Sequence, residues 1–353
     1  MNTNFWRVLI FSILFSCTKN DAIVEAENAL YFPPLSGNNW EQTSVQELGW
    51  NQNQVQPLLD YLEEKNTKGF IILHNGRIVI ENYFNGHTAN TSWYWASAGK
   101  TLTSIMTGIA EENGYLIINN KVSDYLGEGW TNAPLDKENL ITPKHLLSMT
   151  SGLDDSFGDN VTASNLRYFT DAGTRWAYHN VYVKLQSVIE TSTKQSFSSY
   201  FNTHLKEKIG MTGAWVQTGD FSVYYSTVRS MARFGLLALN KGTWETKPIV
   251  NETYFNNSIN TSQTINKSYG YLWWLNGKES FHLPQTQQKF QGYLIPNAPS
   301  DLFCALGKND QKIYVVPSKK LVIIRMGESA EDTNFALSIF DNELWKKINL
   351  IIN

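Results

Sequence analysis

The chain has 353 residues, a hydrophobic share of 42% and a formal net charge of −3. This hydrophobic share is enough for a packed core and excludes wholesale disorder and collagen-like or low-complexity folds. The near-neutral charge, without a run of like charges, gives no indication of nucleic-acid binding. Two cysteines cannot form a disulfide framework, and the six histidines never fall at HxxxH or HxH spacing, so neither a metal nor another cofactor is expected.

The first seventeen residues differ from the rest of the chain. Arg7 precedes the apolar run 8–15, which is too short to span a bilayer because about twenty residues are needed. This pattern predicts a secretory signal peptide over residues 1–17. Its end, Leu14-Phe15-Ser16-Cys17, resembles a bacterial lipobox, so we expect lipid attachment at Cys17. With the lipid, we expect a bacterial lipoprotein of the periplasm or outer membrane that is held to the membrane through this anchor only. Ordinary signal cleavage nearby, with Cys17 removed or incidental, is the alternative, and either route predicts export.

Residues 18–41 are polar, contain Pro33-Pro34 and Gly37, and have no sustained hydrophobic period. This composition predicts a tether. The length of the chain allows two domains or one large one. Because no low-complexity break or internal repeat follows the tether, we expect residues 42–353 to form one domain.

The elements expected in this domain follow in chain order. Residues 69–84 contain two strand-like runs around Asn75-Gly76, the pattern of a β-hairpin. A helix is expected from Ser97 to Asn113, with Gly114 as its C-cap. Residues 115–255 predict a largely helical subdomain, with helices over 181–189 and 228–239.

The end of the chain predicts a return to sheet. Two strands are expected over 312–316 and 321–325, on either side of Pro317-Ser318, and a final amphipathic helix follows. The apolar residues of this helix are Phe335, Ile339, Phe340, Trp345 and Ile348. Strands at both ends with helices between them predict an α/β (α+β) fold, in which one sheet combines N- and C-terminal segments.

The first segment with candidate catalytic residues is Ser97-Ala98-Gly99-Lys100. Positions i and i+3 share a helix face, so the Lys100 amine can lie beside the Ser97 hydroxyl. A serine needs a base to become a nucleophile, and a lysine whose pKa is lowered by desolvation can be that base. Taken alone, the spacing fits equally well an N-cap serine with a solvated lysine.

Tyr178-His179-Asn180 is the second such segment. A tyrosine near a lysine ammonium can shuttle a proton, since its phenolate form becomes less costly there. The amide of Asn180 can hold the lysine on one side and a substrate carbonyl on the other. A core tyrosine followed by a turn asparagine is the alternative.

Together these segments resemble the serine β-lactamase and penicillin-binding-protein family, near its class C-related esterases and 6-aminohexanoate-dimer hydrolases. The resemblance extends over about residues 69–327 and includes the segments 141–153, 229–239, 269–274 and 311–327. It implies the β-lactamase/transpeptidase-like fold, an antiparallel sheet flanked by helices. It also implies that Ser97 is the nucleophile, that Lys100 and Tyr178 form the acid–base pair, and that Asn180 supports them.

The third motif of that family, Lys-Thr-Gly or His-x-Gly on a strand beside the nucleophile, corresponds here to Ala305-Leu306-Gly307. The cation and the hydroxyl are missing, which argues against efficient recognition of a β-lactam carboxylate. The resemblance implies an oxyanion hole from the backbone N–H groups of Ser97 and Lys308, which needs no particular side chain. Asn309-Asp310 then adds a negative charge near the site.

We therefore expect a secreted serine hydrolase that cleaves a small ester or amide through an acyl-enzyme, of esterase or amidase type. One alternative is a true β-lactamase or D,D-peptidase. A catalytically silent fold that binds cell-wall peptides or another surface protein is the other.

Overall fold

The computed structural model describes residues 29–331, 337 and 339–353 of the chain. The predicted signal peptide with Cys17, and residues 18–28 of the predicted tether, lie outside these residues, as does Phe335 of the predicted final helix. Within them, Tyr31–Asn353 forms one compact unit. None of the helices in the described ranges is long and apolar enough to cross a membrane.

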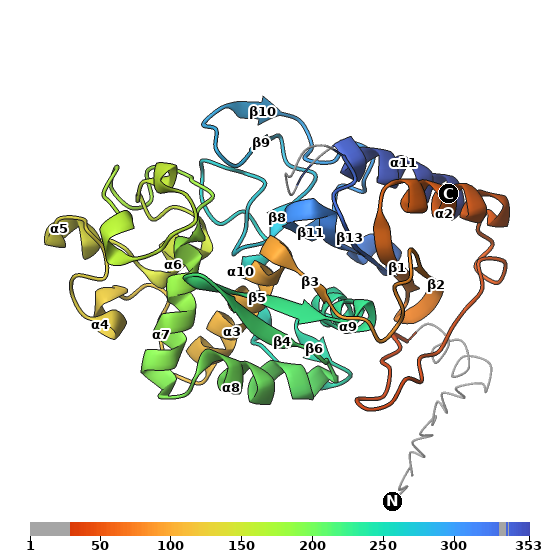
Figure 1. Ribbon diagram of the computed structural model, residues 1–353, viewed down its shortest axis with the longest axis horizontal. Helices are drawn as coiled ribbons and strands as arrows, with labels where there is room; N and C mark the ends of the chain where they lie inside the picture. The colour runs from red at the N-terminus through yellow and green to blue at the C-terminus, as the bar shows by residue number, and fades with distance from the viewer. Residues whose placement is uncertain (1–28, 332–336, 338) are drawn as a thin grey trace, which may run out of the picture. The chain divides into compact units, whose positions relative to one another are not determined.

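A six-stranded antiparallel sheet forms the centre of this unit (Figure 1). Its strand order is β2-β1-β13-β12-β11-β8, so the N-terminal hairpin lies directly beside the C-terminal strands. This arrangement confirms the predicted fold class. In this order the bounds are Arg77–Tyr83, Thr67–His74, Leu321–Gly327, Gln311–Val316, Phe303–Gly307 and Trp274–Leu275.

The predicted hairpin is present as β1 and β2. Asn75 and Gly76 at its turn both have positive φ, 49° and 83°, the backbone that a two-residue hairpin turn requires. Residues 69–73 of β1 are all buried, because helices cover both faces of the sheet. The strand therefore has a continuous apolar run instead of an alternating pattern.

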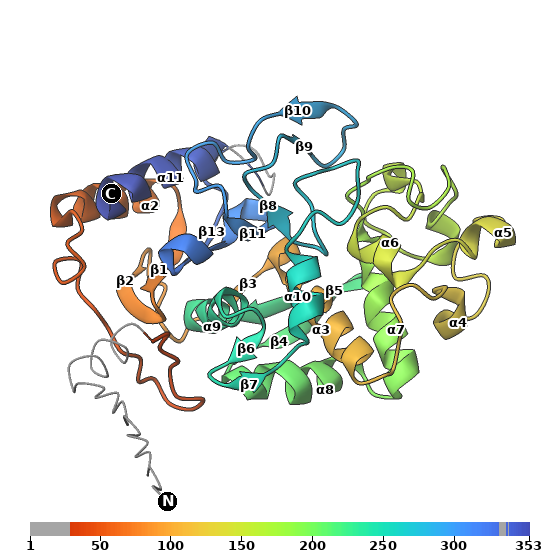
Figure 2. The ribbon, with the colours of Figure 1, turned by 180° about the vertical axis from the view of Figure 1, so that it is seen from behind.

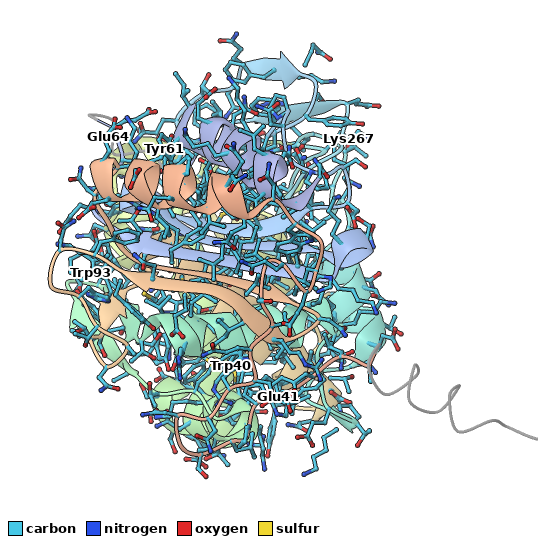
Figure 3. The ribbon with its side chains drawn as sticks, turned by 90° about the vertical axis from the view of Figure 1, so that its right-hand side faces the viewer. Trp40, Glu41, Tyr61, Glu64, Trp93 and Lys267 are labelled. Carbon is cyan, nitrogen blue, oxygen red and sulfur yellow. The ribbon has the colours of Figure 1, made fainter. Side chains whose placement is uncertain are left out.

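One face of the sheet packs against α9 (Val228–Leu239), the helix predicted over 228–239. Gly235 allows the close approach, since a Cβ there would lie 2.4 Å from Val322 Cγ1. The other face is covered by α2 (Val55–Glu64) and α11 (Ile339–Ile352), which lie side by side (Figures 1 and 2). Figure 3 shows Tyr61 on α2, whose ring stacks on Phe340 of α11 at 5.9 Å.

The rest of the unit contains the predicted helices and also a three-stranded sheet, β3-β5-β4, that the sequence did not predict. Its strands are short and lack a clear alternation. They are Trp93–Tyr94, Phe221–Ser226 and Ala214–Thr218. The helices here are α3 (Lys100–Glu112), α4 (Ser123–Leu126), α5 (Leu135–Glu138), α6 (Pro143–Leu147), α7 (Lys184–Thr193), α8 (Phe197–Phe201) and α10 (Glu252–Ser258). Two small antiparallel pairs complete it, β6 (Thr243–Trp244) with β7 (Lys247–Pro248) and β9 (Ser280–His282) with β10 (Lys289–Gln291).

Residues 31–41, which the sequence assigns to the tether, lie against the domain. Trp40, labelled in Figure 3, is buried, and its indole Nε1 donates to Gly76 O at 2.8 Å. Arg233 Nη2 donates to Pro34 O at 2.6 Å. The polar composition of the segment hid this attachment, because a single buried tryptophan leaves no periodic pattern.

Candidate active site

Ser97 lies in a 3-10 turn, Ala96–Gly99, that leads directly into α3. The preceding Trp95 is fully buried, and its backbone N–H donates to Tyr224 O at 2.8 Å while Nε1 donates to Ser226 Oγ at 2.7 Å. Ala96 then adopts a φ of +47°, which costs a residue with a Cβ about 1–2 kcal/mol. The anchored tryptophan thus holds Ser97 at the end of a strained turn, as is common at functional sites.

Lys100 lies one turn after Ser97, as the SxxK spacing predicts. Its Nζ donates to Ser97 Oγ at 2.8 Å, although the side chain is only 3% exposed. The ammonium lies over the rings of Tyr178 and Tyr182, 4.9 and 4.5 Å from their centroids. These contacts exclude the solvated lysine that the spacing alone left open.

Burial lowers the pKa of the Lys100 ammonium to about 7. The negative charge of Asp159 opposes this shift, since it favours the charged form. A substantial fraction of Lys100 is therefore neutral near pH 7, and a neutral amine within hydrogen-bond distance of a hydroxyl can accept its proton.

Tyr178 and Asn180 lie beside this pair, at the start of a 3-10 turn that continues into α7. Lys100 Nζ donates to Asn180 Oδ1 at 3.4 Å, and Asn180 Nδ2 donates to Asp159 Oδ1 at 2.8 Å. The Ala177 N–H donates to Met149 O at 2.9 Å, and this bond joins the chain just before Tyr178 to the segment 141–153. The structure thus brings the four residues predicted from the two motifs into one cluster.

The pKa of Tyr178 differs from the sequence-based expectation. Burial raises the pKa of this phenol to about 12, and a hydrogen bond with Ser97 only partly offsets the shift. The phenolate is therefore disfavoured here even though Lys100 lies nearby, because its desolvation dominates. At neutral pH Tyr178 carries its proton and is suited to donate it.

The strand β11 lies directly against the serine turn. A Cβ on Gly307 would meet Trp95 O at 2.4 Å and Ala98 N at 3.0 Å. Ala305 and Leu306 are each only 1% exposed, so the third-motif strand offers the site its backbone and no charged side chain. Lys308 follows at the end of the strand with an exposed side chain.

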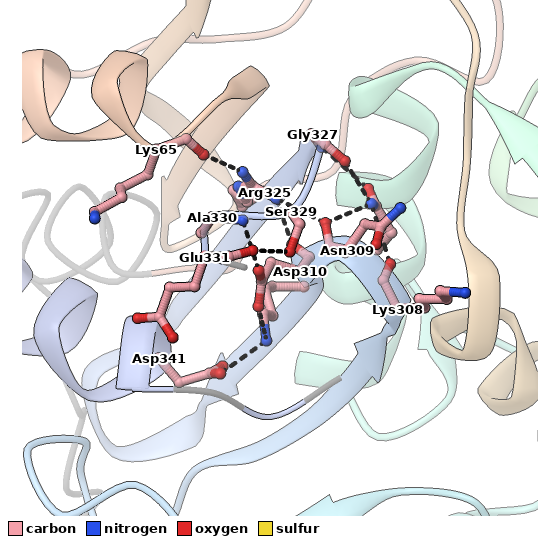
Figure 4. A network of polar contacts seen from close by, with 12 residues as sticks. Lys65, Lys308, Asn309, Asp310, Arg325, Gly327, Ser329, Ala330, Glu331 and Asp341 are labelled. Atoms are coloured by element: carbon pink, nitrogen blue, oxygen red, sulfur yellow. Dashed lines mark hydrogen bonds and ion pairs between the residues drawn. The ribbon is translucent and has the colours of Figure 1, made fainter. Parts of the chain in front are cut away.

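The charge expected from Asp310 does not reach the site. Asp310 is fully buried, its Oδ1 lies 3.1 Å from Lys312 Nζ, and its Oδ2 accepts from the Ala330 N–H at 2.9 Å (Figure 4). Lys312 also pairs with Asp341 of α11 at 2.8 Å. The carboxylate is neutralised inside the sheet, because an unpaired buried charge would be too costly.

Two contributors to this cluster, Asp159 and Tyr182, were missed by the sequence analysis, and a third, Trp274, lies in the segment 269–274 without having been given a role. Asp159 comes from an irregular loop, and its role depends on a contact with Asn180. Trp274 is 2% exposed and stacks on Tyr178 at 5.8 Å, so it belongs to the wall behind that ring. Tyr182 lies four residues after Tyr178, close to a recognised motif.

Among the described residues, no group of three or more His, Cys, Asp or Glu side chains is placed to hold a metal ion.

Comparison with known proteins places these findings in a family. The sequence model of the Beta-lactamase family matches residues 60–336. Among curated proteins, no match to the chain was found.

Three solved structures illustrate the structural similarity. The "Putative 6-aminohexanoate-dimer hydrolase from Bacillus anthracis" has a TM-score of 0.69 and 20% identity, over 90% of this chain and 89% of that one. A beta-lactamase from Mycobacterium bovis has a TM-score of 0.58 and 16% identity, over 80% and 93%. A penicillin binding protein from Bacillus halodurans has a TM-score of 0.59 and 15% identity, over 83% and 99%. At these identities the similarity establishes the fold alone.

Proposed function

We propose, from the premise that this chain belongs to the β-lactamase family, that it cleaves an ester or amide through an acyl-enzyme on Ser97. Membership of this family supports the conclusion that the chain is a serine hydrolase. One observation supports the proposal that Ser97 is the nucleophile: Lys100 Nζ lies 2.8 Å from Ser97 Oγ, and burial lowers the pKa of Lys100 to about 7. A hydroxyl hydrogen-bonded to a base that is largely neutral near the operating pH is an activated nucleophile.

The proposed reaction assigns one step to each group. Lys100 accepts the proton of Ser97 while Oγ forms a bond to the substrate carbonyl carbon, and the backbone N–H groups of Ser97 and Lys308 stabilise the oxyanion. As the oxyanion collapses, the bond to the leaving group breaks and Tyr178 donates a proton to it. Tyr178 regains a proton from the Lys100 ammonium. Water then gives a proton to the neutral Lys100 and attacks the acyl carbonyl carbon. The bond to Oγ breaks, and Lys100 returns the proton to Oγ, which releases the acid and Ser97.

The test is hydrolysis of a short p-nitrophenyl ester by the wild-type protein and by Ser97→Ala. We expect turnover by the wild type and only background hydrolysis by the variant. Wild-type turnover in Ser97→Ala would refute the assignment of the nucleophile.

A β-lactamase or D,D-peptidase is the alternative within the same chemistry. The buried Ala305 and Leu306 stand where the resemblance implies a lysine and a threonine in penicillin-active members of the family, and their absence favours the esterase or amidase type. Turnover of a chromogenic cephalosporin far above that of the ester would reverse this preference.

A catalytically silent binding module is a second alternative. Retention of Ser97, Lys100, Tyr178 and Asn180 in one cluster supports an enzyme. We expect covalent labelling by a fluorophosphonate that is lost in Ser97→Ala. A lack of labelling by both a fluorophosphonate and a penicillin probe would favour the binding module.

The N-terminal sequence supports a further part of the proposal, export and lipid attachment at Cys17. Metabolic labelling with a fatty acid, present in the wild type and absent in Cys17→Ala, is the expected result.

A further inference from the structure

The turn between β11 and β12 supplies the proposed second oxyanion donor, and its backbone is unusual. Gly307 pairs with Gln311 at the ends of the two strands, and three residues connect them. Asn309 and Asp310 both have a φ of +59°. Two consecutive left-handed residues with a Cβ persist only where surrounding contacts enforce the conformation.

Two buried side chains supply such contacts. Gln311 Nε2 donates to Asn309 O at 2.8 Å, to Lys308 O at 3.3 Å and to Gly327 O at 2.6 Å, and its Oε1 accepts from the Gly327 N–H at 3.1 Å. Arg325 Nη1 donates to the carbonyls of Asn309 and Asp310, each at 3.0 Å (Figure 4). Three successive carbonyls of the turn are thus held from the side of the sheet.

Arg325 is in turn fixed by the rest of the sheet. Its Nη2 donates to Lys65 O at 2.6 Å and Glu328 O at 2.9 Å, and its Nε donates to Thr67 Oγ1 at 3.2 Å. Both Gln311 and Arg325 are fully buried. A fully hydrogen-bonded, buried polar network is rigid, so it transfers the rigidity of β1 and β13 to the turn.

We propose that Gln311 and Arg325 are positioning residues that hold the Lys308 N–H in place as an oxyanion donor. This inference rests on the proposed acyl-enzyme function. Neither residue touches the reacting atoms; they act through the carbonyls of the turn. Because β11 lies against the serine turn through Gly307, a shift of the 308–310 backbone would move one donor relative to the other.

The experiment replaces Gln311 by methionine, which is similar in size but lacks the amide. Asn276→Leu is the matched control. Asn276 is 2% exposed, its Nδ2 also donates to three carbonyls and its Oδ1 also accepts one N–H, but its partners are Ile295, Ala298 and Pro299. The two variants therefore lose the same number and kind of hydrogen bonds at different places.

The measurement compares kcat/KM for a p-nitrophenyl ester and for its thionoester. An oxyanion hole favours oxygen, because oxygen accepts hydrogen bonds more strongly than sulfur. We expect Gln311→Met to lower kcat/KM for the oxygen ester roughly tenfold or more and to reduce the oxygen-to-sulfur ratio. Asn276→Leu is expected to lower Tm and to leave that ratio at the wild-type value.

A folded Gln311→Met variant with the wild-type rate and ratio would overturn the inference. So would an equal fall of the ratio in Asn276→Leu, since general loosening would then explain both. If Gln311→Met does not fold, Gln311→Asn keeps the amide but shortens its reach, and the same two outcomes apply. Absence of Ser97-dependent hydrolysis in the wild type would overturn the proposed function itself, and is recognised before any variant is compared.

Discussion

Replacement of Asp159 by asparagine tests whether this carboxylate adjusts the proton affinity of Lys100. The two groups are joined through Asn180 by hydrogen bonds of 3.4 and 2.8 Å, which place the charges roughly 6 to 8 Å apart. Asp159 is exposed, so an effective dielectric constant of about 40 to 80 applies. The interaction is then about 0.6 to 1.2 kcal/mol, or about half to one pKa unit.

The sign of the shift follows from the charges. Asp159 raises the pKa of Lys100 against the larger effect of burial. Removal of the carboxylate therefore lowers the pKa of Lys100 below its present value of about 7. The proposed base must be neutral, so the rise of kcat/KM with pH is expected near pH 7 in the wild type and about half to one unit lower in Asp159→Asn.

The assay measures kcat/KM for a p-nitrophenyl ester from about pH 5 to pH 9, at low and at high salt. The difference in pKa between Asp159→Asn and the wild type is expected to be smaller at high salt, because salt screens the charge of Asp159. Asp60→Asn on α2 removes another exposed carboxylate and is expected to leave the profile unchanged. An unchanged profile in Asp159→Asn, or a move to higher pH, would refute the role given to this charge.

Three further variants test the other parts of the site. Tyr178→Phe should lower kcat by about 10²- to 10⁴-fold, and more for an alkyl ester than for a p-nitrophenyl ester, because a poor leaving group needs the proton more; an equal loss for both would argue against this role. Lys100→Met should abolish turnover but raise the free energy of unfolding at pH 7 by a few kcal/mol, because the lowered pKa of Lys100 makes the wild type less stable below about pH 10. Denaturant unfolding at pH 7 and at pH 10 measures this, and the difference in stability between variant and wild type should shrink as the pH rises. Gly307→Ala should destabilise the protein by about 1–3 kcal/mol and reduce kcat/KM, since its Cβ would lie 2.4 Å from Trp95 O; a stable, fully active variant would contradict the close packing.

Local signals accounted for the parts of the fold that the sequence predicted well. Asn75-Gly76 predicted a hairpin because both residues accept positive φ, and the 3.6-residue period predicted α9 over its full length. The SxxK spacing predicted the contact between Ser97 and Lys100 because both lie within one helical turn.

Contacts between residues far apart in the sequence could not be predicted from such local signals. Asp159 belongs to no motif, and Gln311 and Arg325 lie in the segment 311–327 without a role that the sequence assigns. Their roles depend on which carbonyl or amide the fold brings to them. The raised pKa of Tyr178 was not predicted for the same reason, since it comes from burial of a ring that stacks on Trp274. The strand Trp93–Tyr94 is too short to show any period.

The buried third-motif strand bears on which substrates fit the proposed site. A carboxylate-bearing substrate would lose its hydration on entering, and would need a cation in return. Ala305 and Leu306 supply none, and each is packed inside the sheet at 1% exposure. A lysine at either position would bury its own charge, which is costly unless the charge is paired. This packing of β11 is the physical argument for neutral substrates, and so for the esterase or amidase type, in the function proposed above.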